Sequence, residues 1–197
     1  MSTYLQYNNH MILHPTDPSK YFYGIVEDPP EPPTPTDEVT IGTQTWKNKN
    51  LAIDDGQGGI YTQTVNYGQG NVTEYYYTWA AAVRVAAAVQ GWHLPSRTEW
   101  DTLATSVGGS SIAGTKLKST YGWSSGNGDG SYGFSAFPAG GYSSGSFIKF
   151  GHLGIFWTSA PYNSKNAYRR DFDTGTSMSS NWHEKTQGYS VRLIKDS

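Results

Sequence analysis

Gly91-Trp92-His93-Leu94-Pro95-Ser96-Arg97-Thr98-Glu99-Trp100 is the stretch of this chain that decides its fold. Pro95 ends any strand or helix that precedes it, because its ring fixes φ and it has no N–H to donate. Ser96 can then cap a new helix, and Glu99, three residues later, completes a capping box with it. The stretch therefore predicts a helix that begins near Ser96, with Trp100 on the side that faces the core.

His93 and its charged neighbours raise the question of catalysis. A histidine or a carboxylate in a cleft is a candidate general acid or base. The structural interpretation is that His93 is a hydrogen-bonded residue near the core and that Glu99 and Arg97 form a helix cap and a surface ion pair. We favour the structural interpretation and expect the stretch to identify the scaffold rather than an active site.

Helical patterns are confined to the middle of the chain. The alanine-rich run 78–89 predicts a helix that ends before Gly91, since alanine has the highest helix propensity and glycine often follows a helix end. The helix that begins near Ser96 is expected to run to about Ser106 and to end at Gly108-Gly109. No helix is predicted after that point.

Short β-forming segments surround the two helices. Residues 39–46 alternate β-forming residues across Gly42, which predicts two strands joined by a tight turn. Glycine-rich turns later separate short aromatic segments, which we expect to be strands: 134–137, 141–142, 146–150, 154–159, 167 onward and 189–194. Two helices followed by a run of antiparallel strands indicate an α+β domain.

The composition limits the classes of function. The 197 residues include 15 tyrosines and 7 tryptophans, which predicts a core built from large rings. A formal net charge of −2 argues against electrostatic capture of nucleic acid. The absence of cysteine excludes a disulfide, a thiolate nucleophile and a cysteine-ligated zinc ion. No segment approaches the roughly 20 apolar residues of a membrane span, and residues 1–25 lack a signal-peptide pattern, so we expect synthesis in the cytoplasm without membrane insertion.

The first 38 residues differ in character from the rest. Residues 1–26 are rich in tyrosine, asparagine and histidine, and we expect a small β-hairpin that serves attachment or oligomerisation. Residues 27–38 begin with five prolines in ten residues, which is typical of an extended, semi-rigid linker. The alternative is a plain disordered tail. Residues 39–197 then form the main domain.

Several motifs follow one another in a recognisable order. The opening segment Val39-Thr-Ile-Gly-Thr-Gln-Thr-Trp46, the central Gly91-Trp-His-Leu-Pro-Ser96 and the closing Gly188-Tyr-Ser-Val-Arg-Leu193 are the clearest of them. Further matching segments lie at 77–81, 114–118, 133–141 and 157–159. Together they resemble the Fibrobacter succinogenes major paralogous domain, also called FISUMP, over about residues 39–196.

This resemblance implies a C-type-lectin-like fold, in the variant found in formylglycine-generating enzymes. Those enzymes act through cysteines, which this chain lacks, so their catalysis is not implied. The Glu-Pro-Asn, Gln-Pro-Asp and Trp-Asn-Asp motifs with which carbohydrate-binding C-type lectins hold calcium do not occur in the sequence either. We therefore expect no metal ion, no cofactor and no enzymatic activity.

A second resemblance concerns the last forty residues. Trp157-Thr-Ser159 and Ser190-Val-Arg-Leu193 border an interval dominated by Asn, Tyr, Ser, Thr, Asp, Arg and His. Borders and content are similar to the variable region of proteins altered by diversity-generating retroelements, many of which have FISUMP-like domains. Adenine-directed mutagenesis of asparagine codons reaches all of these residue types. Four residues of the interval lie outside its reach and are expected to be scaffold: Met178, Trp182, Glu184 and Lys185.

The polar residues of this interval are the candidate binding surface. We expect 168–174 and 177–183 to be two arms of a strand–loop–strand, with Phe172 and Met178 pointing inward and the other residues exposed. Exposed tyrosine, arginine and histidine are effective contact residues. The candidate ligand-binding residues are Tyr162, Asn163, Tyr168, Arg169, Arg170, Asp171, Asp173, Thr174, Ser177, Ser179, Asn181 and His183. The alternative is a solvated polar loop without a ligand.

A catalytic interpretation of the same interval rests on two carboxylates. Asp171 and Asp173 alternate along a predicted strand and should therefore point the same way. Paired carboxylates are the catalytic groups of glycosidases. Arg169 and Arg170 beside them favour balancing of surface charge instead.

Taken together, the two resemblances imply a phage tail adhesin that recognises a protein or glycan on the host surface. The N-terminal segment would join it to the tail, or to a surface-anchor protein, or mediate homo-oligomerisation. The expected location is the virion. The alternatives are a bacterial surface or secreted adhesin of the FISUMP type, located at the cell surface, and, less favoured, an enzyme of the formylglycine-generating or glycosidase sort.

Overall fold

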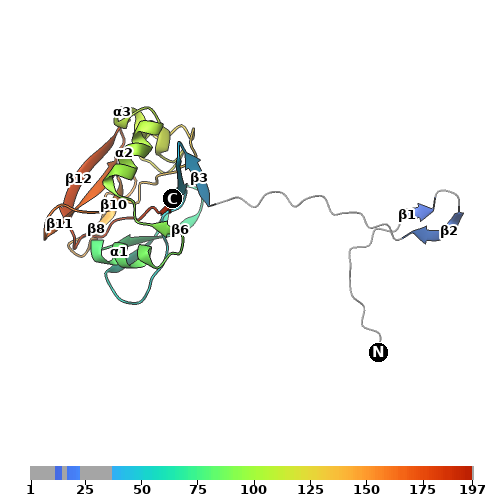
Figure 1. The fold of residues 1–197 in the computed structure, drawn as a ribbon, viewed down its shortest axis with the longest axis horizontal. Helices are drawn as coiled ribbons and strands as arrows, with labels where there is room; N and C mark the ends of the chain where they lie inside the picture. Colours follow the sequence, from blue (N-terminus) through green and yellow to red (C-terminus); the bar gives the residue numbers. More distant parts are fainter. Residues whose placement is uncertain (1–11, 15–16, 23–36, 197) are drawn as a thin grey trace. The chain divides into compact units, whose positions relative to one another are not determined.

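The computed structural model of the chain describes residues 12–14, 17–22 and 37–196 (Figure 1). The chain divides into two compact units, Met1–Thr36 and Asp37–Ser197. No helix within the described residues is both long enough and apolar enough to cross a bilayer.

The first unit contains a small hairpin. Strand β1 (Ile12–His14) pairs antiparallel with β2 (Asp17–Phe22), and the register shifts after Leu13. This is the hairpin expected within residues 1–26. The proline-rich linker predicted at 27–38 lies outside the described residues except for its last two.

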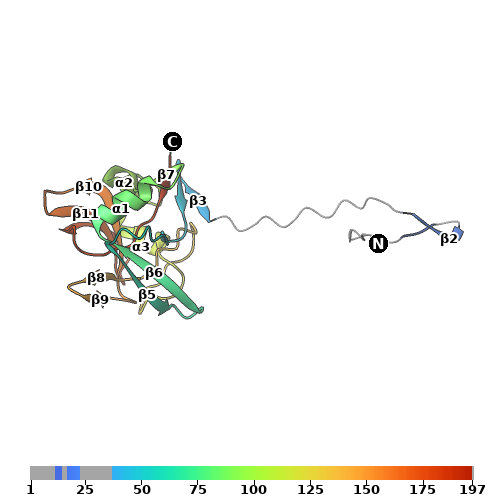
Figure 2. The same cartoon turned by 90° about the horizontal axis from the view of Figure 1, so that it is seen from below.

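The second unit is an α+β domain, as predicted. Its helices are α1 (Trp79–Ala87), α2 (Arg97–Ser106) and α3 (Ser110–Leu117). Its strands are β3 (Glu38–Ile41), β4 (Gln44–Lys47), β5 (Ile60–Asn66), β6 (Asn71–Tyr77), β7 (Trp92–His93), β8 (Gly141–Ser143), β9 (Ser146–Ile148), β10 (Gly154–Pro161), β11 (Asn166–Phe172), β12 (Met178–Glu184) and β13 (Ile194–Lys195). They pair antiparallel in four sheets, ordered β3-β4-β13-β7, β5-β6, β8-β9 and β10-β11-β12. Figure 2 shows the β5–β6 and β8–β9 hairpins at one end of the domain, away from α2.

Helix α2 begins where the sequence predicts. The Ser96 hydroxyl accepts a hydrogen bond from the Glu99 backbone N–H at 3.2 Å, and a Glu99 carboxylate oxygen accepts one from the Ser96 N–H at 2.6 Å. This reciprocal pair is the expected capping box. Trp100 is fully buried, and its ring centroid lies 5.0 Å from that of Trp46 and 5.8 Å from that of Phe134. The predicted core of large rings is thus built around the first turn of α2.

His93 has the structural role that the sequence favoured. Its Nε2 lies 2.8 Å from Glu99 Oε1 and its Nδ1 lies 2.7 Å from Asp196 Oδ1, so the imidazole joins the start of α2 to the end of the domain. The predicted surface pair between Arg97 and Glu99 is wrong. The Arg97 guanidinium instead lies 3.8 Å from the ring centroid of Tyr168, because Glu99 is already engaged by the cap and by His93.

Helix α3 contradicts the expectation that no helix follows Gly108-Gly109. It has no side-chain cap and contains a glycine, so its local sequence does not favour a helix. Packing supplies the stability, since Ala113 and Leu117 are fully buried. A Cβ at Gly114 would lie 2.7 Å from backbone atoms of Thr176 and Ser177. The glycine is therefore what lets α3 approach the loop between β11 and β12.

Two of the predicted strands are wrong. Residues 134–137 form only an isolated bridge from Ala136 to Lys118, because Ser135 adopts a positive φ of 54° that interrupts an extended strand. In the segment predicted as a strand at 189–194, only Ile194 lies in a strand, β13. The preceding residues run between other strands and make isolated contacts, such as the bridge of Ser190 to Phe156.

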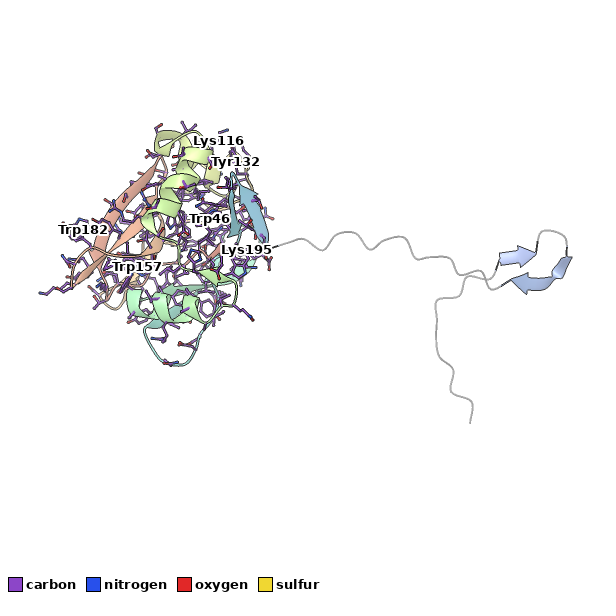
Figure 3. All side chains as sticks on the ribbon, in the orientation of Figure 1. Trp46, Lys116, Tyr132, Trp157, Trp182 and Lys195 are labelled. Carbon is purple, nitrogen blue, oxygen red and sulfur yellow. The ribbon has the colours of Figure 1, made fainter. Side chains whose placement is uncertain are left out.

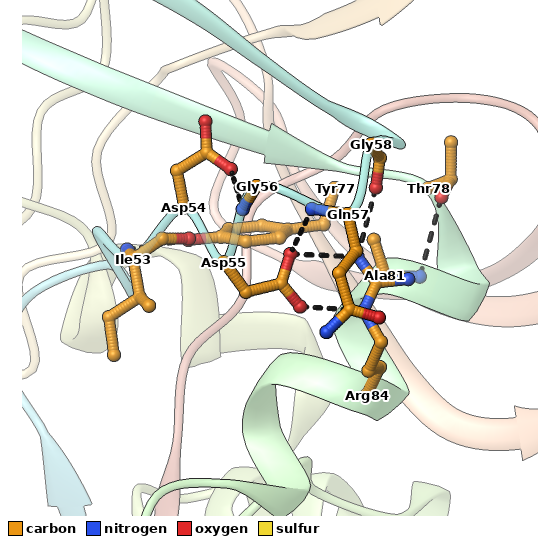
Figure 4. Close-up of polar contacts among 10 residues, drawn as sticks. All are labelled: Ile53, Asp54, Asp55, Gly56, Gln57, Gly58, Tyr77, Thr78, Ala81 and Arg84. Carbon is orange, nitrogen blue, oxygen red and sulfur yellow. Dashed lines mark hydrogen bonds and ion pairs between the residues drawn. The ribbon is translucent and has the colours of Figure 1, made fainter.

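A loop between β4 and β5 is fastened onto α1 (Figure 4). Arg84 Nε donates to Asp55 Oδ2 at 2.6 Å, and its Nη2 donates to Asp55 Oδ1 at 3.0 Å and to the Gly58 carbonyl at 2.9 Å. The Tyr77 hydroxyl accepts from the Ile53 N–H at 2.9 Å. These contacts hold residues 53–58 of the loop in place.

Candidate binding surface on the C-terminal hairpin

The candidate residues lie on and around the β11–β12 hairpin. Strand β11 pairs with β10 on one side and β12 on the other, so β12 is an edge strand of this sheet. The β11–β12 register runs from Asn166 opposite Glu184 to Phe172 opposite Met178. Because side chains alternate along a strand and paired residues share a face, even-numbered residues of both strands lie on one face and odd-numbered residues on the other.

The even face carries an exposed group of rings. Tyr162, just after β10, lies parallel to Trp182, with 4.8 Å between ring centroids and 5° between planes. Its centroid is also 5.2 Å from that of Tyr168, edge to face. The Arg97 guanidinium of α2 lies over the Tyr168 ring, 3.8 Å from its centroid. We call these four residues the aromatic surface; Tyr162 and Trp182 are 46% and 49% exposed, and Figure 3 places Trp182 at the outer edge of the domain.

Arg170 shares the even face but is buried, which contradicts its predicted exposure. It lies under α2, where Nη2 donates to the Arg97 carbonyl at 2.9 Å and to Asp101 Oδ1 at 2.6 Å. Burial lowers the pKa of Arg170, against the raising effect of the Asp101 carboxylate. Arg170 therefore fastens β11 to α2 and is not available to a ligand.

The odd face carries a second group, the polar cluster of Arg169, Asp171, Asn181, His183 and Tyr189. Arg169 Nη2 lies 3.2 Å from Asp171 Oδ2, which also accepts a 2.7 Å hydrogen bond from Asn181 Nδ2. The Arg169 guanidinium lies 4.9 Å from the Tyr189 ring centroid, and the His183 ring meets the same phenol edge to face. These contacts link four of the predicted residues to one buried tyrosine.

Burial governs the charges within the polar cluster. It raises the pKa of Asp171, although Arg169 and Asn181 oppose the effect. Burial, followed by the charge of Arg169, lowers the pKa of His183, so this imidazole is neutral at neutral pH. Arg169 Nε, Asp171 Oδ1 and His183 Nδ1 are buried and have no hydrogen-bond partner within the described residues. Buried polar atoms are normally satisfied by the protein or by an ordered water, and these three are enclosed too far to contact a ligand at the surface.

The prediction that Asp171 and Asp173 point the same way is wrong. Strand β11 ends at Phe172, so Asp171 is buried in the polar cluster whereas Asp173 is exposed in the loop 173–177. The Asp173 side chain accepts the Gly175 N–H at 2.8 Å and shapes the turn. Lys118 Nζ donates to the carbonyls of Asp173 and Gly175, at 2.9 and 2.6 Å. The paired carboxylates of a glycosidase are therefore not assembled here.

Asn163 is used by the turn that joins β10 to β11. Its side-chain oxygen accepts the N–H groups of Lys165 and Asn166, at 2.9 and 2.7 Å. Its carbonyl accepts from Lys185 Nζ at 3.0 Å, and the same ammonium lies 4.5 Å from the Trp79 ring centroid. Asn163 and Lys185 thus fix the conformation of the turn that follows Tyr162.

The twelve predicted residues do not form one exposed surface. The even face holds or adjoins Tyr162, Tyr168 and Arg170, and the odd face holds Arg169, Asp171, Ser179, Asn181 and His183. The turns hold Asn163, Asp173, Thr174 and Ser177. A single convergent face was expected because exposure was assigned from polarity, but Arg170 and Asp171 are buried. The role of the other ten predicted residues in ligand binding stays a prediction.

Comparison with known proteins identifies the family. Residues 39–195 match the sequence model of the Fibrobacter succinogenes major domain. The chain belongs to this family. Neither a curated protein nor a solved structure was found to match it. Membership of the Fibrobacter succinogenes major domain family is compatible with a surface or binding protein.

Two residues of this Fibrobacter succinogenes major domain were missed as surface candidates. Trp182 was predicted to be scaffold, yet it is half exposed, whereas Met178 on the same face is buried. The alternation from Met178 places both on one face, but the sequence does not indicate that α3, which packs against β12, leaves Trp182 uncovered. Arg97 was assigned to a pair with Glu99, although its position at the start of α2 also brings it to Tyr168.

The chemistry available on the hairpin is stacking and hydrogen bonding. Among the described residues, no group of three or more histidine, aspartate or glutamate side chains is placed to hold a metal ion. The aromatic surface offers ring faces, and the exposed Ser179 and Asn181 beside the polar cluster offer hydrogen-bonding groups. Both are contact groups for a ligand.

Proposed function

We propose that this domain is a C-type-lectin-like receptor-binding module whose contact region is the β11–β12 hairpin. In this proposal it is the adhesin of a phage tail and recognises a protein or glycan on the host surface. The single observation that carries the proposal is the aromatic surface, in which Tyr162 and Trp182 are stacked and half exposed.

The arrangement of the elements supports the fold assignment. Strand β4, near the start of the domain, and β13, near its end, lie side by side, with Ile194 opposite Trp46. Helices α1 and α2 precede the C-terminal antiparallel strands. The pairing of β4 with β13 brings the two ends of the domain together. In this proposal the β11–β12 hairpin, which lies between them in the sequence, is the outer element that contacts a receptor.

The physical properties of the aromatic surface support binding. Exposed tryptophan and tyrosine rings provide a large contact area at a low loss of conformational freedom, and with arginine they dominate the energetics of protein interfaces. The stack of Tyr162 on Trp182, the edge contact with Tyr168 and the cover by Arg97 hold these groups in place before a partner arrives. Such preorganisation strengthens binding.

We further propose that the hairpin is diversified by a retroelement. Ser177 and Ser179 are exposed and belong to neither core cluster, so their side chains can change without entering the core. Met178, expected to be constant, is buried in the core. A reverse-transcriptase gene beside this one, with a template repeat that differs from residues 160–187 only at adenines, is the expected finding. A gene neighbourhood with no such repeat contradicts the proposal.

The remaining parts of the proposal concern location and partners. The N-terminal unit joins the domain to the tail or mediates homo-oligomerisation, and the protein is located in the virion. Linked copies would strengthen weak single contacts through avidity. The alternative is a bacterial surface adhesin of the same family. A signal peptide encoded upstream in the natural gene favours the cell surface and contradicts the virion.

Binding to intact cells tests the function. Fluorescently labelled full-length protein is incubated with a panel of bacteria, and bound fluorescence is measured by flow cytometry. The double variant Tyr162→Ala with Trp182→Ala is expected to reduce binding at least about tenfold, as for central aromatic contacts. Treatment of the cells with protease or periodate separates protein from glycan receptors.

The matched control is Phe147→Ala in β9, which removes another partly exposed ring, 38% exposed, from a different sheet. This variant is expected to bind cells as the unaltered protein does. Equal loss with Phe147→Ala, or unchanged binding by the double variant on every strain that the unaltered protein binds, contradicts the proposed surface.

A further inference from the structure

A pocket of about 320 Å³ lies outside the hairpin. The segment 49–52 lines it on one side, and residues of the β5–β6 hairpin and the chain between these strands line the other. Leu51 and Tyr67 are buried in it, while Val72 at its rim is 47% exposed. Its volume is at the lower end of the range for small-molecule sites, roughly 300–1,000 Å³. It shares no residue with the aromatic surface or the polar cluster.

Glu74 lines this pocket and is only 5% exposed. One carboxylate oxygen accepts the Tyr67 hydroxyl at 2.9 Å, and the other accepts Asn50 Nδ2 at 3.0 Å. Both donors are neutral groups. A carboxylate has about four acceptor positions, so two hydrogen bonds leave capacity for a ligand.

The nearest buried cation reaches Glu74 only through Asn50. Arg192 Nη2 donates to Asn50 Oδ1 at 2.9 Å, and its other donors go to the carbonyls of Lys47, Phe134 and Ser135. Lys49 lines the pocket as well, but its ammonium lies 2.6 Å from Asp37 Oδ1. No cation of the described chain therefore contacts the Glu74 carboxylate directly, and a buried charge of this kind is stabilised strongly by a paired cation.

Aromatic rings form the walls beside Glu74. The centroid of Phe137 lies 4.7 Å from that of Tyr67 and 5.2 Å from that of Tyr121, and all three residues line the pocket. Burial and the Glu74 charge raise the pKa of Tyr67, so its hydroxyl stays a neutral donor at neutral pH. Aromatic faces attract cations, most strongly where water is displaced, and cages of rings bind quaternary ammonium groups.

We infer that this pocket is a binding site for a small organic ammonium compound, with the cationic head against Glu74 and the rings of Tyr67, Tyr121 and Phe137. The apolar wall formed by Leu51 and Val72 receives the alkyl part of the ligand. A neutral ligand of the same shape would bury the carboxylate further without compensating its charge, so the pocket discriminates by charge.

Choline is the probe that tests this site, and its neutral carbon isostere dimethylbutanol is the matched ligand control. Isothermal titration calorimetry on the full chain is expected to give saturable choline binding at millimolar concentrations or below, and at least about tenfold weaker binding of the isostere. Glu74→Gln is expected to weaken choline binding at least about tenfold.

Tyr121→Leu provides a second variant, because Tyr121 is only partly buried and the hydrogen bonds to Glu74 come from Asn50 and Tyr67. It is expected to weaken choline binding with an unchanged circular dichroism spectrum, even if Glu74→Gln fails to fold. Trp182→Ala is the matched protein control and is expected to bind choline normally while losing cell binding. No saturable choline binding, or equal affinity for the neutral isostere, overturns the assignment and leaves the proposed receptor-binding function unaffected.

Discussion

His93 and Asp196 are 103 residues apart in the chain, and Nδ1 of the imidazole lies 2.7 Å from Oδ1 of the carboxylate. The other ring nitrogen contacts Glu99, which also caps α2. One side chain therefore joins the helix start, strand β7 and the end of the domain. This contact makes the stability of the domain depend on pH.

We predict that His93 stabilises the domain most at mildly acidic pH. Burial lowers the pKa of His93, but the hydrogen bonds to Asp196 and Glu99 and their charges outweigh it, so the pKa is raised. A raised folded-state pKa contributes stability that is complete below the ordinary value of about 6.5 and is lost as the pH rises through the folded value. Urea unfolding of the unaltered protein and of His93→Gln is expected to differ most at about pH 6 and least at about pH 9. A difference that does not change with pH contradicts this.

Gly114→Ala is expected to destabilise the domain, although alanine is the better helix former. The new Cβ would meet backbone atoms of Thr176 and Ser177 at 2.7 Å, and backbone gives way less readily than a flexible side chain. We expect a loss of about 1–3 kcal/mol in the free energy of unfolding. Ser111→Ala, at an exposed position of α3, is the control and should change the free energy by less than about 0.5 kcal/mol. Stabilisation by Gly114→Ala would refute the close approach of α3 to the loop.

Arg192→Met should be strongly destabilising. The Arg192 side chain is fully buried and donates to Asn50 and to three backbone carbonyls, so its loss leaves several buried acceptors unsatisfied. Burial lowers its pKa to about 9, so the group remains cationic at neutral pH. We expect a loss of about 3 kcal/mol or more in the free energy of unfolding. Lys195→Met, at an exposed position, is the control; similar effects of both variants would rule out this account.

Trp182 should account for most of the tryptophan fluorescence that iodide quenches. It is 49% exposed, whereas Trp46, Trp100, Trp123 and Trp157 are buried and Trp79 and Trp92 are less exposed than Trp182. Trp182→Phe is expected to lower the iodide quenching constant clearly with little loss of stability, because the side chain is at the surface. Unchanged quenching would mean that the indole is covered in solution.

The Arg84 clamp should control the dynamics of the loop that follows the pocket. The hydrogen bond from Arg84 lowers the pKa of Asp55, so this contact is complete above the ordinary carboxylate range and is lost as the pH falls through the lowered value. Arg84→Gln is expected to speed hydrogen exchange at the backbone amides of Gly56 and Gln57. These two N–H groups donate to the carboxylates of Asp54 and Asp55. Exchange that is unchanged in this loop would contradict the clamp.

The parts of the fold that the sequence predicts are those set by local interactions. The Ser96–Glu99 capping box lies within four residues, and the β3–β4 turn depends on one glycine, Gly42, at a φ of +61°. Helix α3 was missed because its stability comes from contacts with Thr176 and Ser177, some sixty residues away. The β5–β6 hairpin was also missed, although its tyrosines, threonines and valines are typical strand residues.

The candidate site could be predicted as a segment but not as a surface. The polar interval does fold into a strand–loop–strand, β11 to β12. Polarity alone did not indicate that Arg170 would be buried beneath α2 beside Asp101, because a buried arginine is placed by partners distant in sequence. Trp182 is the converse case, an apolar residue that stays at the surface although Met178 on the same face is buried.

The middle of strand β12 is the least fastened part of the hairpin. Lys118 holds the loop 173–177 through backbone carbonyls, Arg170 joins β11 to α2, and the Lys185 carbonyl accepts from the Trp79 N–H. Residues 179–182 of β12, in contrast, are exposed. Substitutions that share no partners have additive and independent effects on stability. Exposed positions of β12 such as Ser179 and Ser180 can therefore change while the free energy of the core stays nearly constant, so recognition and folding can evolve separately at these positions.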